Sequence, residues 1–330
     1  MKLGLFLLPL VFAASALSAQ EPAPVSRGAE VNHSVNASLG TEPNAEHGAQ
    51  AKRDIIMPHI TDSHHLEIPW VNAEWGREIS LPRWEPLHIG GTAVDMSPTK
   101  HVVMLLLAAT LCALTLIVSA QAHRRHTHEV GRPKGFAAGM EAVVLYVRDE
   151  VILNNVGPHG NGFVPYLLTV FFFILFANVL GLIPYGSTAT GNISVTAMLA
   201  IMSFIVIEIA GMRALGKGYL GTIFYWPSDM KFSPMKIFLF LILTPVELLG
   251  KFTKPFALAI RLFANMTAGH VVVLAFIGII FTFHSVWVAP APFLMALGIM
   301  ILEVLVAFIQ AYIFTLLTSV FIGQLRVAHH

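Results

Sequence analysis

Between residues 236 and 284 the chain is apolar and helical in character over a much longer stretch than one membrane crossing requires. At 1.5 Å per residue, about 50 helical residues extend for about 70 Å, whereas a perpendicular crossing needs only about 30 Å. A second long apolar segment, residues 291 to 323, follows a break near residues 288 to 292. Upright helices of this length would leave apolar side chains in water. The sequence therefore predicts a helical hairpin that is strongly tilted or lies partly along the membrane plane.

Shorter apolar runs of membrane-spanning length precede this hairpin, at residues 101 to 122, 163 to 183 and 193 to 212. Of the 330 residues, 55% are hydrophobic and only 12% are charged, which is too apolar for an ordinary soluble domain. The predicted fold is all-α and polytopic, with upright transmembrane helices plus the long tilted hairpin. A net charge of +1 without a Lys/Arg stripe excludes a nucleic-acid partner. The single cysteine, Cys112, excludes a disulfide framework and a thiolate metal site within one chain.

The first 99 residues differ from the rest. Residues 1 to 19 combine one lysine, a short apolar core and small residues, which is typical of a cleavable signal peptide, with an uncleaved anchor as the alternative. Residues 20 to 99 are polar and lack periodicity, so they predict a mostly extended arm outside the cytoplasm. Histidines in this arm fit no helical ligand pair, and no metal site is predicted. The membrane domain is expected to occupy residues 100 to 330.

The distribution of Lys and Arg predicts the orientation. Residues 129 to 162 mix charged and apolar residues, as in a helix lying on the membrane surface. Cytoplasmic loops carry an excess of Lys and Arg, and such residues flank the loop between residues 217 and 236. Placing this loop inside puts the turn at Pro184 and the N-terminal arm outside, and Arg326 inside. The signal peptide predicts the same side for the arm.

Arg261 lies inside the long apolar stretch although its guanidinium cannot lose its proton. An arginine near a bilayer centre costs roughly 2.5 to 3.5 kcal/mol on insertion scales, so it is interpreted as functional, the alternative being a side chain that snorkels to the headgroups. Glu247 precedes it by nearly four helical turns and projects to a similar face about 21 Å away along the axis. Asn265 at i+4 shares that face, and His270 points roughly to the opposite side.

In the second long segment, Glu303 and Gln310 are two helical turns apart and predict a polar track against the first segment. Desolvated Glu and His side chains can exchange protons near physiological pH, and Asn and Gln can order water, so the set suits a proton relay. Arg261 instead stays positive: it can block proton leakage between two aqueous pockets and attract a carboxylate on a moving partner. The alternative is that the ionisable groups only tie helices together.

Four distinct sequence motifs lie within the membrane domain. They are AIRLFANMTAGH at residues 259 to 270, NVLGLIPYG at 178 to 186, GNISVTAMLA at 191 to 200 and PVELLGKFTKP at 245 to 255. Together they closely resemble the family of subunit a of the F-type ATP synthase, over about residues 100 to 326. By this resemblance, Arg261 is the family's essential arginine, and Gln310 faces it from the last helix. Glu247 and Asn265 match residues lining aqueous half-channels, and His270 with Glu303 matches a pair whose residue types occur in either order.

The resemblance implies a proton-translocating stator subunit of the bacterial plasma (inner) membrane. Protons from outside would pass Asn265, His270 and Glu303 to a carboxylate on the ring of c subunits, and leave to the cytoplasm near Glu247. The tilted hairpin would follow the c-ring. The implied partners are the c-subunit ring, the b-subunit peripheral stalk, the rest of the complex and the lipid bilayer. No cofactor is expected, and nucleotide chemistry would occur on other subunits because the chain lacks a phosphate-binding glycine loop with its lysine.

A self-contained ion channel or secondary transporter is the alternative function. Voltage sensors repeat basic residues along one helix, whereas this segment has a single arginine in its apolar core. Secondary transporters commonly show two related halves with paired broken helices, and the sequence has no such repeat. These features favour the stator subunit, and the pairing of His270 with Glu303 favours protons over sodium as the coupling ion.

Overall fold

The computed structural model describes the membrane domain and part of the arm, namely residues 62–68, 77–84, 87–89, 92–94, 97–126, 135–158, 160–183, 188–224, 234–283 and 287–327. The predicted signal peptide lies outside these residues. The described part of the arm forms two antiparallel hairpins, β1 (His65–Ile68) with β2 (Arg77–Ser80) and β3 (Leu87–Ile89) with β4 (Thr92–Val94). The chain is extended in these short strands; the rest of the predicted arm lies largely outside the described residues.

All elements after the arm are helical. In order they are α4 (Lys100–His126), α5 (Phe136–Tyr146), η2 (Val147–Leu153), α6 (Asn154–Val156), η3 (Gly160–Gly162), α7 (Val164–Gly181), η4 (Ala189–Gly191), α8 (Ile193–Leu215), η5 (Gly216–Thr222), α9 (Pro234–Phe283) and α10 (Pro290–Val327). Within the described residues, five of them, α4 and α7 to α10, are long and apolar enough to cross a membrane. The prediction of an all-α polytopic membrane protein is confirmed.

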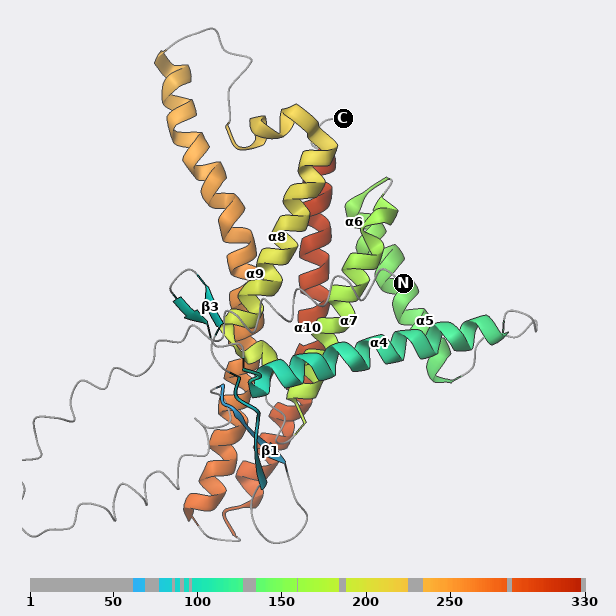
Figure 1. Cartoon of the computed structure of the whole chain (residues 1–330), viewed down its shortest axis with the longest axis vertical. Coiled ribbons are helices and arrows are strands. Elements are labelled where there is room, and N and C mark those ends of the chain that lie inside the picture. The colour runs from blue at the N-terminus through green and yellow to red at the C-terminus, as the bar shows by residue number, and fades with distance from the viewer. Residues whose placement is uncertain are drawn as a thin grey trace, which may run out of the picture.

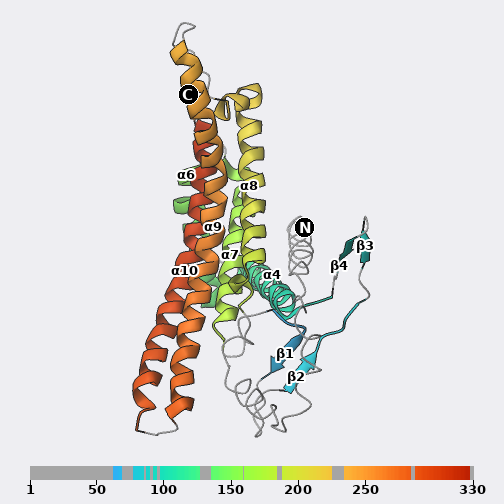
Figure 2. The ribbon, with the colours of Figure 1, turned by 90° about the vertical axis from the view of Figure 1, so that its left-hand side faces the viewer.

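The predicted long hairpin consists of α9 and α10. These helices have 50 and 38 residues, and Figures 1 and 2 show them side by side and joined at one end. Helix α9 continues through Pro245 and Pro255. In its apolar 18-residue window only 6% of the residues are buried inside the chain, and over the whole helix most described side chains are exposed or half-buried. Most of its surface is therefore left for lipid or for another protein.

Helix α4 crosses the other long helices at a steep angle. Figure 1 shows α4 lengthwise and Figure 2 shows it almost end-on, whereas α7, α8 and α10 run alongside one another. No membrane normal can be parallel to both groups. At about 75 Å, a helix of the length of α9 is far longer than a perpendicular crossing of a bilayer of about 30 Å requires.

Helix α7 forms the centre of the bundle. Of its apolar span, 72% is buried, including Leu167, Phe172, Phe173 and Ile174, and it contacts α4, α10 and η4. A helix that is hydrophobic all round is one that other elements surround. Its burial leaves α9 on the outside of the bundle.

Cations hold the end of the bundle at which α8 and α10 finish (Figure 1). Near the C-terminus, Arg326 donates hydrogen bonds to the carbonyl oxygens of Val156 and Pro158, at 3.2 and 2.9 Å. Between α8, α9 and η5, the buried ammonium of Lys251 lies 2.9 Å from the Tyr219 hydroxyl and 3.5 Å from Glu208 Oε2. Removing one member of such a buried pair leaves the other charge without compensation. Lys251 therefore ties α9 to α8.

A glycine substitution tests the packing of α10 against the segment before α7. A Cβ at Gly323 would collide with the carbonyl oxygen of Asn155, so Gly323→Ala is expected to destabilise the fold by about 1 to 3 kcal/mol through overpacking. Gly139→Ala is the matched control, because a Cβ there meets nothing within 4 Å. The measurement is the thermal unfolding midpoint of the purified protein in detergent. Equal midpoints for the two variants would contradict this packing.

Candidate functional site

Arg261 lies on an exposed face of α9. Glu247 and Asn265 are also exposed on this helix, so these three predicted site residues lie on its outer surface. Among the residues that the structure describes, no carboxylate lies within ion-pair distance of the Arg261 guanidinium. A permanent cation on an apolar surface without a counter-charge is unusual, because desolvated charges are normally paired.

Gln310 reaches the same turn of α9 from α10. Its side chain is buried, and its Nε2 donates a hydrogen bond to the backbone carbonyl oxygen of Arg261 at 3.4 Å. The contact is with the main chain rather than with the guanidinium. Gln310 thus attaches α10 to the turn that carries the arginine, while the arginine side chain stays on the outer face.

His270 and Glu303 meet on the inner side of α9. His270 Nδ1 lies 3.4 Å from Glu303 Oε1, with 21% and 10% of the two side chains exposed. The atoms are within ion-pair distance, but neither has hydrogen-bond geometry with any partner among the described residues. The pair is close enough to share a proton after a small adjustment.

The other nitrogen of the His270 ring is held by hydrogen bonds. Nε2 lies 2.8 Å from the carbonyl oxygen of Gly181 and 2.6 Å from the Thr188 hydroxyl. Because a carbonyl oxygen can only accept, Nε2 must carry a hydrogen, and this assigns the tautomer. In neutral His270 the lone pair of Nδ1 therefore faces Glu303. The arrangement favours one proton shared by imidazole and carboxylate, since a lone pair facing a carboxylate without a proton between them is repulsive.

Two glycines allow this close approach. A Cβ at Gly269 would collide with the Glu303 carboxylate, and a Cβ at Gly181 would lie 2.6 Å from Thr188 Oγ1. Sequence reasoning assigned no role to these glycines or to Thr188. Both glycines lie inside the motifs that carry the family resemblance, and this position in the motifs is the sequence feature that could have pointed to them. Glycine is needed at both positions because a side chain closely approaches the backbone.

A second buried polar contact lies beside the His270 site. The Thr190 hydroxyl donates to Asn178 Oδ1 at 2.8 Å, and Asn178 Nδ2 donates to the carbonyl oxygen of Ala307 at 3.5 Å. Both side chains are fully buried. Sequence reasoning missed this pair as well, although Asn178 opens one of the four motifs. Polar groups thus continue from η4 into the interface between α7 and α10.

The structure therefore sorts the six predicted site residues into three groups. Arg261, Glu247 and Asn265 are on the outer face of α9, Gln310 lies between α9 and α10, and His270 with Glu303 forms the inner pair. No group of three His, Cys, Asp or Glu side chains that could hold a metal ion occurs in the described part of the chain.

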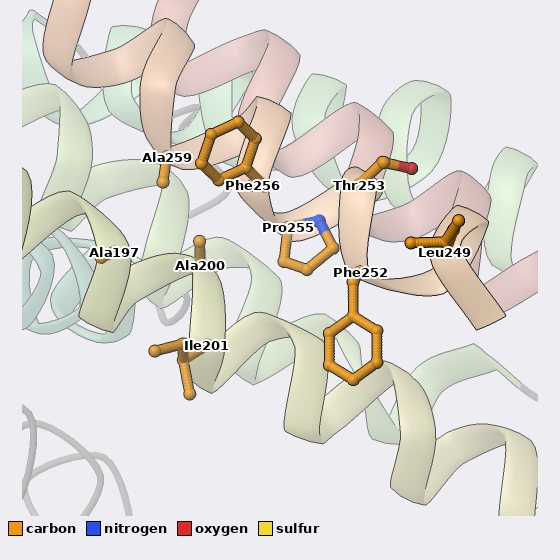
Figure 3. Close-up of a pocket in the computed structure, with 9 residues that line it drawn as sticks. All are labelled: Ala197, Ala200, Ile201, Leu249, Phe252, Thr253, Pro255, Phe256 and Ala259. Carbon is orange, nitrogen blue, oxygen red and sulfur yellow. The ribbon is translucent and has the colours of Figure 1, made fainter.

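A groove of about 400 Å³ between α8 and α9 is not part of this site. Figure 3 shows its lining, which has no ionisable side chain: Ala197, Ala200, Ile201, Leu249, Phe252, Thr253, Pro255, Phe256 and Ala259. It offers no group that can take up a proton.

Comparisons with known proteins agree on one family. The family model described as ATP synthase A chain matches residues 101–323. A protein named ATP synthase subunit a from Anaeromyxobacter dehalogenans (strain 2CP-C) is 40% identical over 329 residues, covering 94% of this chain and 82% of the relative. ATP synthase subunit a 2 of Chlorobaculum tepidum is 42% identical over 343 residues, covering 98% and 90%. ATP synthase subunit a of Chloroherpeton thalassium is 41% identical over 310 residues, covering 89% and 87%.

The contact between Gly269 and Glu303 can be tested by a double-mutant cycle. Gly269→Ala is expected to lower the thermal unfolding midpoint of the purified protein, because the new methyl group collides with the carboxylate. In a Glu303→Ala background the collision is gone, so the same change should cost less, with a coupling of about 0.5 to 3 kcal/mol. Gly298→Ala in α10, where a Cβ meets nothing within 4 Å, is the control. Additive effects of Gly269→Ala and Glu303→Ala would refute the contact.

Proposed function

Because this chain belongs to the ATP synthase A chain family, we propose that it is the proton-translocating stator subunit of an F-type ATP synthase. It provides two offset aqueous half-channels to a ring of c subunits and couples proton flow to rotation and ATP synthesis. The observation that carries this proposal is the separation of charges across α9. Arg261 lies exposed on the outer face without a counter-charge in the described chain, while His270 and Glu303 lie behind it.

The surface around Arg261 suits a closely packed partner helix. Ala257, Ala264 and Ala268 are exposed on α9 at helical spacing from Arg261. Small side chains let helix backbones approach closely inside a membrane. A carboxylate on the partner would supply the counter-charge for the arginine. This combination supports the c-ring as the partner of the outer face, with the long tilted hairpin following its curvature.

Uptake begins at the inner pair. His270 and Glu303 hold one proton, and delivery of this proton past Asn265 neutralises a carboxylate of the c-ring. A neutral carboxylic acid is cheap to move into lipid, whereas a carboxylate is not, so only the protonated site can rotate away. A proton from the outer aqueous phase then refills the pair. Thr188 keeps the ring of His270 turned towards Glu303 during this cycle.

Release takes place on the other side of the arginine. A protonated carboxylate that returns from lipid meets the fixed positive charge of Arg261, which favours its deprotonated form. The proton leaves towards the cytoplasm by way of Glu247, which lies on the same outer face. Since Arg261 cannot give up its own proton, it prevents a direct passage between the uptake and release paths. Rotation follows from two offset paths and one fixed charge.

The contacts of the arm support the proposed orientation. The first turn of α4, which follows the arm, contacts the N-cap of α8 through His101 and Asn192. The charge distribution and the predicted signal peptide both support a position of the arm and of this turn outside the cytoplasm. Arg326 lies at the other end of α10 and is assigned to the cytoplasmic side. We further propose that the protein lies in the bacterial inner membrane and that the b-subunit peripheral stalk is another of its partners.

Removal of the arginine tests the function directly. In inverted vesicles that carry the assembled complex, Arg261→Ala and Arg261→Lys are both expected to reduce ATP-driven proton pumping to background. Alanine lacks the charge, and the lysine ammonium lacks the planar guanidinium and can lose its proton when desolvated. Arg213→Ala, an exposed arginine in the last turn of α8, is the control and should pump normally. Normal pumping by both Arg261 variants in assembled complexes would overturn the proposal.

A second test concerns the group that orients His270. Thr188→Val keeps the shape of the side chain but removes the hydroxyl 2.6 Å from Nε2. Proton pumping is expected to fall several-fold while the complex stays assembled, because a lost neutral hydrogen bond costs about 0.5 to 1.5 kcal/mol. Thr282→Val on α9, where the hydroxyl bonds the backbone carbonyl of Gly278, is the matched control. Equal pumping by the two variants would show that Thr188 does not position the ring.

A further inference from the structure

A buried acid and imidazole pair joins the arm to the membrane domain. Asp62 Oδ1 lies 3.2 Å from His101 Nδ1 and also accepts from the His101 backbone N–H at 3.4 Å. Only 2% of His101 is exposed. The proton path proposed above uses neither residue. The Asp62 side chain is only 13% exposed, and aspartates are seldom buried that far unless they are paired.

The hydrogen bonds around His101 Nδ1 depend on its protonation. Asn192 Nδ2 lies 3.3 Å from this same nitrogen. The Asn192 amide is orientated by its oxygen, which accepts from the Ser194 backbone N–H at 2.9 Å, so its NH₂ group faces the ring. A protonated Nδ1 can donate only to Asp62, whereas an unprotonated Nδ1 can accept only from Asn192. Gain or loss of one proton therefore exchanges one partner for the other without moving the ring.

The pair lies next to the uptake site. Asn192 caps α8 directly after η4, and η4 contacts α4, α7, α8 and α9. From η4, the carbonyl oxygen of Gly191 accepts from the Thr267 hydroxyl at 3.4 Å, and Thr188 just before it bonds His270. Polar groups thus run from Asp62 through Asn192 and η4 to His270 and Glu303. Figure 2 shows β1 and β2 of the arm on the side of α4 towards the joined ends of α9 and α10.

We propose that Asp62 and His101 form an outer proton-collecting station of the uptake half-channel, built jointly by the arm and the first turn of α4. This proposal rests on the proposed function. A proton from the outer aqueous phase binds His101 Nδ1 and is held against the Asp62 carboxylate. The proton then passes through water towards Thr188 and the pair of His270 and Glu303. After it has left, the Asn192 amide donates a hydrogen bond to the unprotonated Nδ1 of His101. One proton enters and one leaves, so the station returns to its starting charge.

The electrostatics of Asp62 suit this role. Burial opposes ionisation of its carboxyl group, but hydrogen bonds and charge attraction, mainly from His101 with a smaller part from Thr99, together outweigh burial, and the pKa of Asp62 lies below its usual value. Asp62 is therefore an anion at neutral pH and attracts protons. Its Oδ2 is buried and has no hydrogen-bond partner in the described part of the chain, which leaves an acceptor for water. The other titratable groups nearby are His64 of the arm, Lys100 beside His101, and His270 with Glu303 beyond η4.

The test is ATP synthesis by the complete complex in inverted vesicles, whose lumen corresponds to the outer side. A fixed electrical potential drives synthesis while the lumen pH varies from about 5.5 to 8.5. For His101→Asn and Asp62→Asn, we expect the midpoint of the lumen-pH profile to move to a more acidic value by about one unit. Rates should fall about tenfold at alkaline lumen pH and approach wild type at acidic pH, where protons are abundant. The control is His64→Asn: the His64 ring contacts the Pro98 carbonyl oxygen and takes no part in the proposed path, so this variant should leave the profile unchanged.

The lumen-pH profile of ATP synthesis distinguishes a proton-collecting role of Asp62 and His101 from a purely structural one. If the pair only fastened the arm, both variants would lower the rate by the same factor at every lumen pH, or not at all, and either result overturns the proposal. Asp62→Asn preserves the shape of the side chain and decides the matter if His101→Asn does not assemble. Failure of both to assemble would assign the pair to folding and overturn the proposal too. Arg261→Ala in the same vesicles tests the proposed stator function separately from the proton-collecting station. The stator function is refuted only if this variant still makes ATP.

Discussion

The contact between α9 and α10 determines what every polar side chain of the hairpin can do. Glu303 fits against α9 because Gly269 has no side chain, and Gln310 bonds the backbone of the turn that carries Arg261. These two contacts, two helical turns apart on α10, set the rotation of α9 about its own axis. With that rotation, His270 faces inward to Glu303 and the guanidinium faces outward. A small change in rotation would bury the arginine or expose the pair, and burying an unpaired charge is costly.

Close packing and polar chemistry occur together around this contact. Gly181, Thr188 and His270 meet within hydrogen-bond distance, and Asn178 bonds Thr190 beside them. In a membrane no water is available to satisfy such groups, so each must find a partner within the protein or in a narrow aqueous path. Proton exchange needs groups that are satisfied in two protonation states. The tautomer of His270 is held on one side and left open towards Glu303 on the other, which meets that need.

The crosswise position of α4 determines where the arm meets the bundle. Because α4 crosses the bundle, His101 in its first turn lies next to η4, which contacts four of the long helices. The arm follows directly before α4, so Asp62 lies beside the same junction. The far end of the bundle is held differently, by Lys251 between α8 and η5. A polar junction at one end and an ion pair at the other hold α9 at a fixed position, as a stator surface requires.

The sequence by itself determined the properties that depend on local spacing and composition. The apolar runs predicted the helices and the excess length of the hairpin, and the 3.6-residue period placed Glu247 and Asn265 on the face of Arg261. The motifs indicated the family that the comparisons then established. Only the tertiary structure decided which distant groups meet. Thr188 and His270 are 82 positions apart, and Asp62 and Asn192 approach the same nitrogen of His101. Neither these contacts nor the crosswise α4 could be read from the chain, because they arise from the packing of helices against one another and not from any periodicity within one helix.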